Sequence, residues 1–395
     1  MSISETSTAN YADSNIVSID CRVMEIPLLT PFRFATYTLN TLPYTWVRLQ
    51  TADDRVTYGE APTYWDPTGE TSLGAVGAIE HWKDEGILRQ NTRNVGQIRE
   101  LMESTAGGAY AARCAIEMAI LDNLGQTLNK PAVELLGGIR SPVKSHAVIG
   151  LPSPESDQDN RLEEVENKVA GGASVVKFKS SAPSYEQDAR LIEAVDDRYG
   201  NNIVKFVDAN QSWGDARSAL PKIKKMAELG VDWIEQPINA IDLEDQSYLA
   251  ENSPIPIMLD ESVMDYRSLK NLIYLGIAKS VNLKLAKAGG PFSAMKFIEL
   301  AEQNNIPYSI GSMVESGLGM LSNFVVAQAS APITCGFDAY TTVDDGLDVG
   351  FIREGELFKR RADYESRPGL GYDPVEMKNA FNRGYIVTLQ ANNER

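Results

Sequence analysis

The stretch Val175-Val176-Lys177-Phe178-Lys179 predicts a buried β-strand that ends in two lysines. Side chains alternate along a strand, so both lysines share a face with Val175, while Val176 and Phe178 point the other way. A helical pattern follows, and Val204–Asp208 is again a short apolar run with a charge at its end. Strands that alternate with helices in this way predict βα units and a parallel sheet.

From about residue 143 the whole chain follows this alternation. Eight strand candidates fall within about 200 residues, with helical stretches of 10–15 residues between them. This spacing predicts a (β/α)8-type barrel over residues 141–355, with a doubly wound sheet as the alternative. The eight candidates are Lys144–Gly150, Ser174–Phe178, Ile203–Asp208, Val231–Glu235, Pro256–Asp260, Ser280–Lys284, Pro307–Ile310 and Ile333–Phe337.

The residues before the barrel have a different pattern, with strands first and helices afterwards. Residues 16–140 are therefore expected to form an α+β capping domain, and residues 356–395 a C-terminal tail that packs back on it. Residues 1–15, rich in Ser, Thr and Asn, are expected to be a disordered tail. The expected elements are the strands Ile16–Pro27, Thr45–Thr51 and Arg55–Glu60 and the helices Ser72–Trp82, Val95–Met102 and Ala109–Leu128.

Composition excludes several classes of protein. The formal charge is −17, from 54 acidic and 37 basic residues, and such a surface repels nucleic acid and anionic membranes. No apolar run approaches the roughly 20 residues that span a bilayer, and the first residues lack a signal-peptide pattern. Three scattered cysteines, Cys21, Cys114 and Cys335, favour the cytoplasm. With only two histidines, His81 and His146, the bases of an enzyme are expected to be lysines or carboxylates.

Charged residues stand at the ends of five candidate strands, and strand phase allows all of them to face one lumen. Asp208 is in phase with Phe206, and the other charges are in phase with apolar or amide residues of their own strands. The C-terminal end of barrel strands is where such enzymes place their chemistry. One charge at a strand end is usually a cap or a solvated ion pair, but five in phase are harder to produce by chance. The strand-end residues are Lys177 with Lys179, Asp208, Glu235, Asp260 and Lys284.

These residue types in this arrangement predict a metal site between two bases. Three carboxylates at spacings of 27 and 25 residues form an oxygen cluster that needs a cation, and Mg²⁺ fits best because it keeps positions open for substrate oxygens. Lys179 and Lys284 lie four strands apart in an eight-stranded ring, hence on opposite sides of a substrate. The metal, the second ammonium and desolvation are expected to lower the lysine pKa. Lys205 is out of phase and Lys287 lies beyond its strand, so both are expected on the surface.

The motifs around these residues resemble those of the enolase superfamily, muconate-lactonizing subgroup. The resemblance covers residues 16–350 and includes Gly311–Gly319, similar to the seventh barrel turn of that family; the seventh strand carries no His, unlike mandelate racemases. It implies that Mg²⁺, with Mn²⁺ as a substitute, stabilises an enediolate after removal of the α-proton of a carboxylate. The motifs are Lys177-Phe178-Lys179, Asp208-Ala209-Asn210, Glu235-Gln236-Pro237, Asp260-Glu261-Ser262 and Asn282-Leu283-Lys284.

The same resemblance implies a role for each residue. Lys179 and Lys284 are the acid and base, and Lys177 holds the substrate carboxylate. Asp208, Glu235 and Asp260 bind the metal. Asn210 and Glu261 support these ligands, and the residues expected to contact substrate are Phe34, Tyr37, Ser312, Met313, Asp338 and Tyr340.

Within the subgroup, the N-terminal segments Thr30–Ala35 and Gly59–Thr63 are most similar to dipeptide epimerases. Two positions depart from that pattern: Tyr340 stands where those enzymes carry the second carboxylate of Asp-x-Asp, and Tyr37 where Ala-Glu-specific members carry Arg. A small-molecule dipeptide or amino-acid derivative other than Ala-Glu is therefore expected. N-acylamino acid racemisation, syn-elimination of the o-succinylbenzoate synthase type and muconate cycloisomerisation remain alternatives, and a non-catalytic barrel is the alternative from another class. A closed symmetric homo-oligomer is the default expectation.

Overall fold

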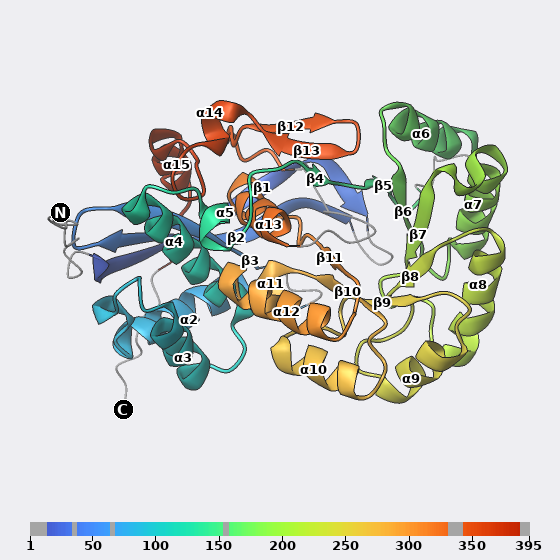
Figure 1. Cartoon of the computed structure of the whole chain (residues 1–395), viewed down its shortest axis with the longest axis horizontal. Coiled ribbons are helices and arrows are strands. Elements are labelled where there is room, and N and C mark those ends of the chain that lie inside the picture. The colour runs from blue at the N-terminus through green and yellow to red at the C-terminus, as the bar shows by residue number, and fades with distance from the viewer. Residues whose placement is uncertain (1–13, 34–37, 64–67, 153–157, 331–342, 388–395) are drawn as a thin grey trace, which may run out of the picture.

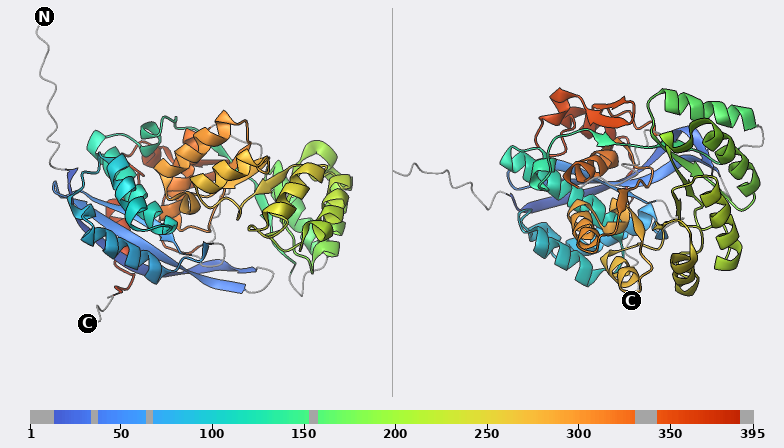
Figure 2. Two further views of the ribbon diagram at one scale, coloured as in Figure 1. Left: turned by 90° about the horizontal axis from the view of Figure 1, so that it is seen from below. Right: turned by 45° about the vertical axis from the view of Figure 1, so that its right-hand side comes forward.

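A three-stranded antiparallel sheet opens the fold (Figure 1). The computed structural model describes residues 14–33, 38–63, 68–152, 158–330 and 343–387. The sheet has the order β1-β2-β3, and β1 and β2 extend into the segment between the first two predicted strands, with a break in register between Pro27 and Phe32. In the left view of Figure 2 its long blue hairpin runs under the orange helices of the second half of the chain. The strands are β1 (Ile16–Arg33), β2 (Thr38–Thr51) and β3 (Val56–Pro62).

Of the three predicted helices, α2 and α4 pack on this sheet and α3 packs on those two helices; α4 is almost wholly buried. It carries four alanines, one of which, Ala115, lies against β3, and small side chains there let its backbone approach that strand closely. Gly59 of β3 has no room for a side chain, because a Cβ there would overlap the carbonyl oxygen of Ala115. The helices are α2 (Ser72–Asp84), α3 (Val95–Thr105), α4 (Tyr110–Leu128) and α5 (Ala132–Leu135), with a 3-10 turn at Ile87–Arg89.

The second half of the chain forms a curled, parallel, seven-stranded sheet with the order β11-β10-β9-β8-β7-β6-β5. Seven of the eight predicted strands are therefore confirmed, and the eighth, Ile333–Phe337, lies outside the described residues. The strands are β5 (Ala147–Ile149), β6 (Val175–Lys179), β7 (Val204–Asp208), β8 (Trp233–Glu235), β9 (Ile257–Leu259), β10 (Ser280–Leu283) and β11 (Tyr308–Ile310).

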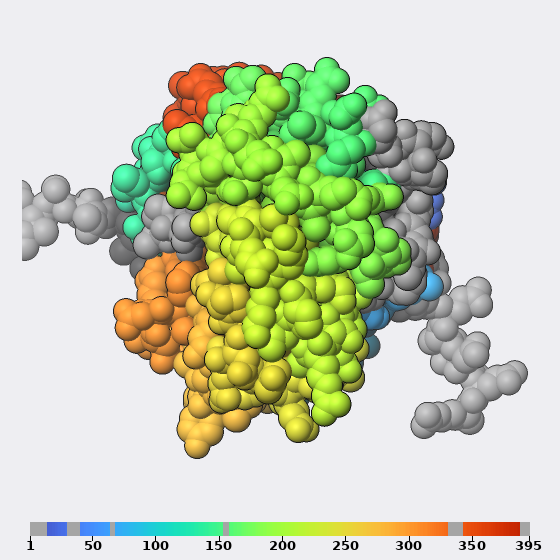
Figure 3. Space-filling view, turned by 90° about the vertical axis from the view of Figure 1, so that its right-hand side faces the viewer, coloured from blue at the N-terminus to red at the C-terminus, as the bar shows by residue number. Residues whose placement is uncertain are grey.

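Helices cover the outer side of this sheet, as βα units require. Figure 3 shows one such face, where residues of α6 to α9, coloured green to yellow, form the surface. The helices are α6 (Gln158–Ala170), α7 (Tyr185–Tyr199), α8 (Ala216–Glu228), α9 (Leu243–Asn252), α10 (Tyr266–Tyr274), α11 (Leu285–Ala288), α12 (Pro291–Gln303) and α13 (Gly317–Ala329), with a 3-10 turn at Gly200–Asn202. Within the described part of the chain, no helix has both the length and the apolar character to cross a membrane.

Residues of the C-terminal segment contact the first domain. Tyr372 accepts a hydrogen bond from the amide of Tyr58, and the amide of Leu370 donates to Asp122. The predicted strand Lys144–Gly150 is divided, because its first residues form β4 (Val143–Lys144), which pairs with a hairpin near the predicted barrel end. These elements are β12 (Phe351–Glu354), β13 (Leu357–Arg360), α14 (Ala362–Glu365) and α15 (Pro374–Phe381).

The barrel interior confirms the phase argument made from the sequence. Val175, Phe206, Trp233 and Met258 form a small separate cluster of buried side chains. The rings of Phe206 and Trp233 stack with centroids 4.8 Å apart. Each of these residues lies two or four positions before a strand-end charge, so the charges project from the same face of the sheet.

The prediction that Lys205 is a surface residue was wrong. Its side chain does point away from the lumen, but it is only 1% exposed. Its Nζ forms an ion pair with Asp196 of α7 at 2.8 Å and donates to the carbonyl of Gly200 at 2.8 Å. The outer face of a barrel strand is covered by helices, so a residue out of phase with the lumen lies between sheet and helix rather than in water.

The close approach of β3 and α4 leads to a stability prediction. Gly59→Ala should lower the free energy of unfolding by about 1–3 kcal/mol or more, because the added methyl overlaps rigid backbone. Gly77→Ala in α2 is the control, since a Cβ there meets no atom within 4 Å. The control should be neutral or stabilising by about 0.5–1 kcal/mol. Urea denaturation of both variants measures this, and equal stability of the two would contradict the packing described for β3 and α4.

Candidate active site

A row of charged residues lies across neighbouring strands at the carboxyl edge of the parallel sheet. Lys179 on β6 pairs in register with Asp208 on β7, which pairs with Glu235 on β8. Asp260 directly follows β9, and Lys284 directly follows β10. The three carboxylates are almost completely buried. The structure thus brings together the five strand-end positions that the sequence singled out.

Lysine ammonium groups neutralise the first two carboxylates. Lys177 Nζ lies 2.9 Å from Glu235 Oε2 and 3.1 Å from Asp208 Oδ2. Lys179 Nζ lies 2.6 Å from the same Asp208 oxygen. Burial alone would raise the pKa of Asp208, yet the ammonium groups of Lys179 and Lys177 hold it below its usual range. Burial, followed by the negative charge of Asp208, raises the pKa of Glu235 to about 7.

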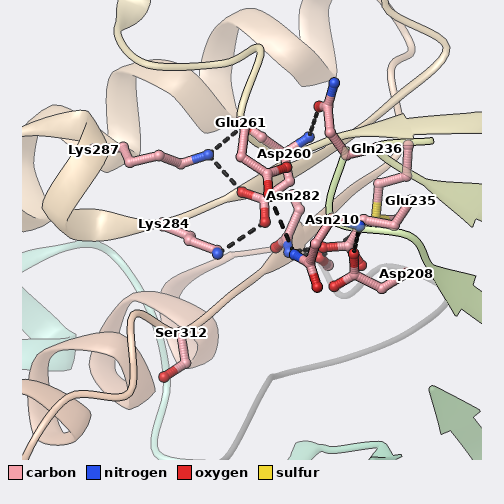
Figure 4. A network of polar contacts seen from close by, with 12 residues as sticks. Asp208, Asn210, Glu235, Gln236, Asp260, Glu261, Asn282, Lys284, Lys287 and Ser312 are labelled. Carbon is pink, nitrogen blue, oxygen red and sulfur yellow. Dashed lines mark hydrogen bonds and ion pairs between the residues drawn. The ribbon is translucent and has the colours of Figure 1, made fainter. Parts of the chain in front are cut away.

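Asp260 is held by two lysines, one on each oxygen (Figure 4). Lys284 Nζ lies 2.8 Å from Oδ2, and Lys287 Nζ lies 2.6 Å from Oδ1. The expectation that Lys287 lies on the surface was wrong, because α11 turns its side chain back under Asp260. Burial lowers the pKa of Lys284, but the carboxylates of Asp260 and Glu261 together outweigh this effect and raise that pKa above its ordinary value. The chain's own charges therefore act opposite to the lowering predicted from the sequence.

Asn210 and Glu261 support this row. The Asn210 side chain accepts from Lys179 at 3.0 Å and donates to Glu261 at 3.3 Å, and its backbone amide donates to Asp208 at 3.0 Å. Asn210 adopts a left-handed φ of 41°, which Asn tolerates better than most residues. Burial, followed by the charges of Asp260 and Asp208, raises the pKa of Glu261 to about 8.

Sequence reasoning missed three amide and hydroxyl residues that fix the carboxylates. Asn282 donates to Glu235 Oε1 at 2.8 Å and accepts from Ser309 at 2.8 Å. The Gln236 side chain accepts from the Asp260 amide at 2.9 Å. A polar residue inside an apolar strand was the sequence signal that could have identified Asn282, because this residue is in phase with Lys284 and so faces the same lumen.

The donor set fits a hard divalent cation, although the described side chains do not stand as a ready metal cage. Within the described ranges, no three acidic, His or Cys side chains are grouped to hold an ion. Lysines lie between the carboxylates instead, and one Glu261 oxygen, Oε2, is buried and has no hydrogen-bond partner among the described residues. Carboxylate oxygens are the ligands that Mg²⁺ prefers. Asp208, Glu235 and Asp260 are thus chemically suited to Mg²⁺, with lysine contacts serving as the counter-charge here.

The turn after β11 brings Ser312 and Met313, both buried, toward this edge. Figure 4 shows Ser312 below Lys284. Ser312 donates to Glu315 at 2.5 Å and accepts from the amide of Val314 at 2.8 Å. Their predicted contact with substrate stays a prediction. The other predicted substrate-binding residues, which are Phe34, Tyr37, Asp338 and Tyr340, lie outside the described residues.

Two capping-domain side chains hold this turn from the other side. Tyr44 of β2 donates to the carbonyl of Val314 at 2.6 Å, and Val314 has a left-handed φ of 59°, which is rare for a β-branched residue. Glu60 of β3 accepts from Trp46 at 2.8 Å and from the amide of Ser316 at 3.0 Å, and also from the Ser316 hydroxyl. Burial raises the pKa of Glu60 to about 8 in spite of these donors.

A parallel barrel sheet with lysines and buried carboxylates at its carboxyl edge has its charged groups where barrel enzymes carry their active sites. The chain belongs to the enolase superfamily. Residues 18–137 match the family described as mandelate racemase / muconate lactonizing enzyme, N-terminal domain, and residues 160–378 match the family described as enolase C-terminal domain-like. The predicted fold class is confirmed, and the chain is an enzyme of the isomerase class.

The relatives include racemases, epimerases and muconate cycloisomerase 1 of Pseudomonas putida. N-succinyl-L-Arg/Lys racemase of Bacillus cereus is 31% identical over 91% of this chain and 95% of its own length. L-Ala-D/L-Glu epimerase of Bacillus subtilis is 30% identical over 90% and 96%. Its substrate-liganded structure matches with a TM-score of 0.81 at 28% identity, covering 91% and 98%. Dipeptide epimerase of Enterococcus faecalis, solved with Mg and L-Leu-L-Tyr, matches with a TM-score of 0.80 at 28% identity, covering 90% and 99%.

The buried Glu60 leads to a pH prediction. Its carboxyl keeps a proton up to about pH 8 in the folded state, whereas in the unfolded chain it loses it near its ordinary value of 4.5. The folded state therefore binds more protons in this window, and its stability declines as pH rises from 5 to 8. Relative to Glu60→Gln, wild type should lose stability on the order of a few kcal/mol across this range. Urea denaturation at pH 5, 6.5 and 8 measures it.

Glu25→Gln, on an exposed position of β1, is the control and should follow the wild-type profile. Parallel wild-type and Glu60→Gln profiles from pH 5 to 8 would show that Glu60 is ionised in the folded state.

Proposed function

We propose that this protein is a Mg²⁺-dependent epimerase or racemase that inverts the α-carbon of a dipeptide or another amino-acid derivative. The observation that carries the proposal is the position of two lysines. Lys179 ends β6 and Lys284 follows β10, four strands along the same curled sheet, with buried carboxylates between them. A substrate carbon between two such groups is accessible to a base on one face and an acid on the other.

The reaction needs one neutral lysine and one ammonium. The neutral lysine takes the α-proton, and the electron pair left on carbon moves into the substrate carboxylate to give an enediolate. The opposite lysine then returns a proton to the other face of the carbon, so the substrate keeps its composition and inverts its configuration. In the reverse direction the two lysines exchange roles.

Charge stabilisation makes proton removal feasible. Lys177, between Asp208 and Glu235, is a fixed cation that we assign to the enediolate oxygens, and fixed charges of this kind are usually the largest contribution to catalysis. When bound by Asp208, Glu235 and Asp260, Mg²⁺ would supply further positive charge and withdraw the carboxylate oxygens from the lysines. Mn²⁺ is proposed as a substitute, because it accepts the same oxygen ligands.

The relatives and three residues of this chain support the proposed substrate class. The relatives act, by name, on N-succinyl-Arg/Lys and on dipeptides. Tyr37 stands where Ala-Glu-specific epimerases carry Arg, so an acidic second residue lacks a partner. Asp338 remains and Tyr340 replaces a second carboxylate, which favours a polar or cationic amino-terminal portion next to an aromatic ring. Cycloisomerisation or elimination is the second candidate, because it uses the same proton abstraction with one lysine.

The remaining expectations belong to the same proposal. They are the domain limits 16–140, 141–355 and 356–395, a closed symmetric homo-oligomer and a cytoplasmic location. The contacts of Tyr372 and Leu370 with Tyr58 and Asp122 support a tail that packs on the capping domain.

The substrate class is tested by deuterium uptake. Mg²⁺-loaded enzyme is incubated in D₂O with libraries of dipeptides and N-acylamino acids, and mass spectrometry detects a gain of one deuterium at the α-carbon. We expect uptake with members that carry a polar or cationic first residue, and L-Ala-D/L-Glu should not be the best substrate. If Ala-Glu is best, the roles given to Tyr37 and Tyr340 are wrong. Product formation with loss of water or ring closure, without inversion, would favour the second candidate.

The two-base mechanism is tested with single lysine variants. Lys179→Ala and Lys284→Ala should each reduce epimerisation roughly 10²–10⁴-fold, because both directions need a donor and an acceptor. Each variant should still exchange the α-proton of the one isomer that faces its remaining lysine, with opposite preferences. Lys205→Met is the control for a lost buried lysine and should retain both exchanges. Exchange of both isomers by either variant alone would mean that the two lysines are not opposed.

A further inference from the structure

Lys287 is a buried lysine that the proposed reaction does not use. It belongs to α11, the four-residue helix that begins directly after Lys284. Its side chain is only 1% exposed, and its Nζ lies 2.6 Å from Asp260 Oδ1. The same Nζ also donates to the main-chain carbonyl of Asp260. Among the described residues, both hydrogen bonds of this ammonium are therefore donated to Asp260.

A buried ammonium is costly unless it is paired, so a lysine in this position needs a reason. Lys205 shows the ordinary case in the same fold. Its ammonium pairs with Asp196, whose carboxylate is one-third exposed, in the layer between sheet and helix. Lys287 instead pairs with Asp260, which is itself buried at the carboxyl edge of the sheet.

The two oxygens of Asp260 are divided between two lysines. Lys287 Nζ donates hydrogen bonds to Oδ1 and to the main-chain carbonyl, so it holds both the side chain and the backbone of Asp260. Lys284 takes Oδ2. Figure 4 shows both lysines at one end of the polar network, with Asp208 and Glu235 at the other. With Oδ1 held, rotation of the carboxylate is restricted, and Oδ2 stays directed at Lys284.

We propose that Lys287 is a positioning residue: it fixes the Asp260 carboxylate so that one oxygen remains available for a divalent cation while the other is permanently occupied. This inference rests on the proposed function, in which Asp260 is a ligand of Mg²⁺. Lys287 touches neither substrate nor metal. It acts through Asp260, by lowering the cost of orienting that ligand. Partners of this kind typically change metal affinity 10–100-fold when removed.

The test compares Lys287→Met with Lys205→Met, because both remove a buried ammonium from a lysine that is 1% exposed. Calorimetric titration of the purified full-length chain with Mg²⁺, and electron paramagnetic resonance with Mn²⁺, give metal affinity without any turnover. Lys287→Met should weaken the Kd for Mg²⁺ roughly 10–100-fold. Lys205→Met should keep the wild-type Kd, even where its melting temperature falls.

Turnover provides an independent measurement. The Mg²⁺ concentration for half-maximal activity should rise with the Kd in Lys287→Met, while kcat at saturating Mg²⁺ changes much less. Circular dichroism establishes that the variant is folded. If Lys287→Met does not fold, Lys287→Gln, which retains a polar side chain, takes its place in the same titration and should show the same weakened Kd.

Three results would overturn the inference, and they are distinguishable. A folded Lys287 variant with a wild-type Kd would mean that the lysine only stabilises the fold. An equal loss of affinity in Lys205→Met would mean that any buried charge change has this effect. Wild type that binds neither ion would refute the metal in the proposed function, and the role of Lys287 would fail with it.

Discussion

Four buried carboxylates at one edge of a sheet are the constraint on which this structure depends. Asp208, Glu235, Asp260 and Glu261 are removed from water, and like charges so close together cannot all be ionised without cations nearby. The chain supplies lysines from β6 and from the segment after β10. Lys177, Lys179 and Lys284 are therefore structural counter-charges as well as the lysines to which the proposed reaction gives a role, and a bound cation would take over part of their charge balance.

Because side chains alternate along a strand, the barrel places all of these charged residues on the same face of the sheet. A residue two or four positions after an interior apolar side chain must face the same lumen, so Phe206 and Trp233 pack below while Asp208 and Glu235 lie above. The apolar layer excludes water from beneath, and the amides of Asn282 and Gln236 fix the carboxylates laterally. The same strands therefore place both the apolar side chains of the barrel interior and the carboxylates of the candidate site.

Much of this was predictable from the sequence because periodicity and strand phase are local properties. The strand-end charges, seven barrel strands and the helices of the first domain were found in that way. Lys205 and Lys287 were not, since sequence phase says which way a side chain points but not what covers it. The direction of the Lys284 pKa was missed for a related reason: it depends on which charge lies 2.8 Å away, and that is fixed by tertiary structure. Glu60 gave no sequence signal of its contact with Ser316, 256 residues away.

The hydrogen bonds from the first domain to the turn after β11 have a consequence for how this chain can evolve. Tyr44 and Glu60 belong to the first domain, whereas Val314 and Ser316 lie more than 250 residues later, yet Tyr44 donates to Val314 and Glu60 accepts from Ser316. A recombination event that exchanges the first domain between relatives would separate these partners. The Ser316 amide and hydroxyl would lose their acceptor, Glu60, and Val314, which has a left-handed φ, would lose its hydrogen bond from Tyr44. Natural diversification of this chain should therefore favour changes in loops over exchange of whole domains.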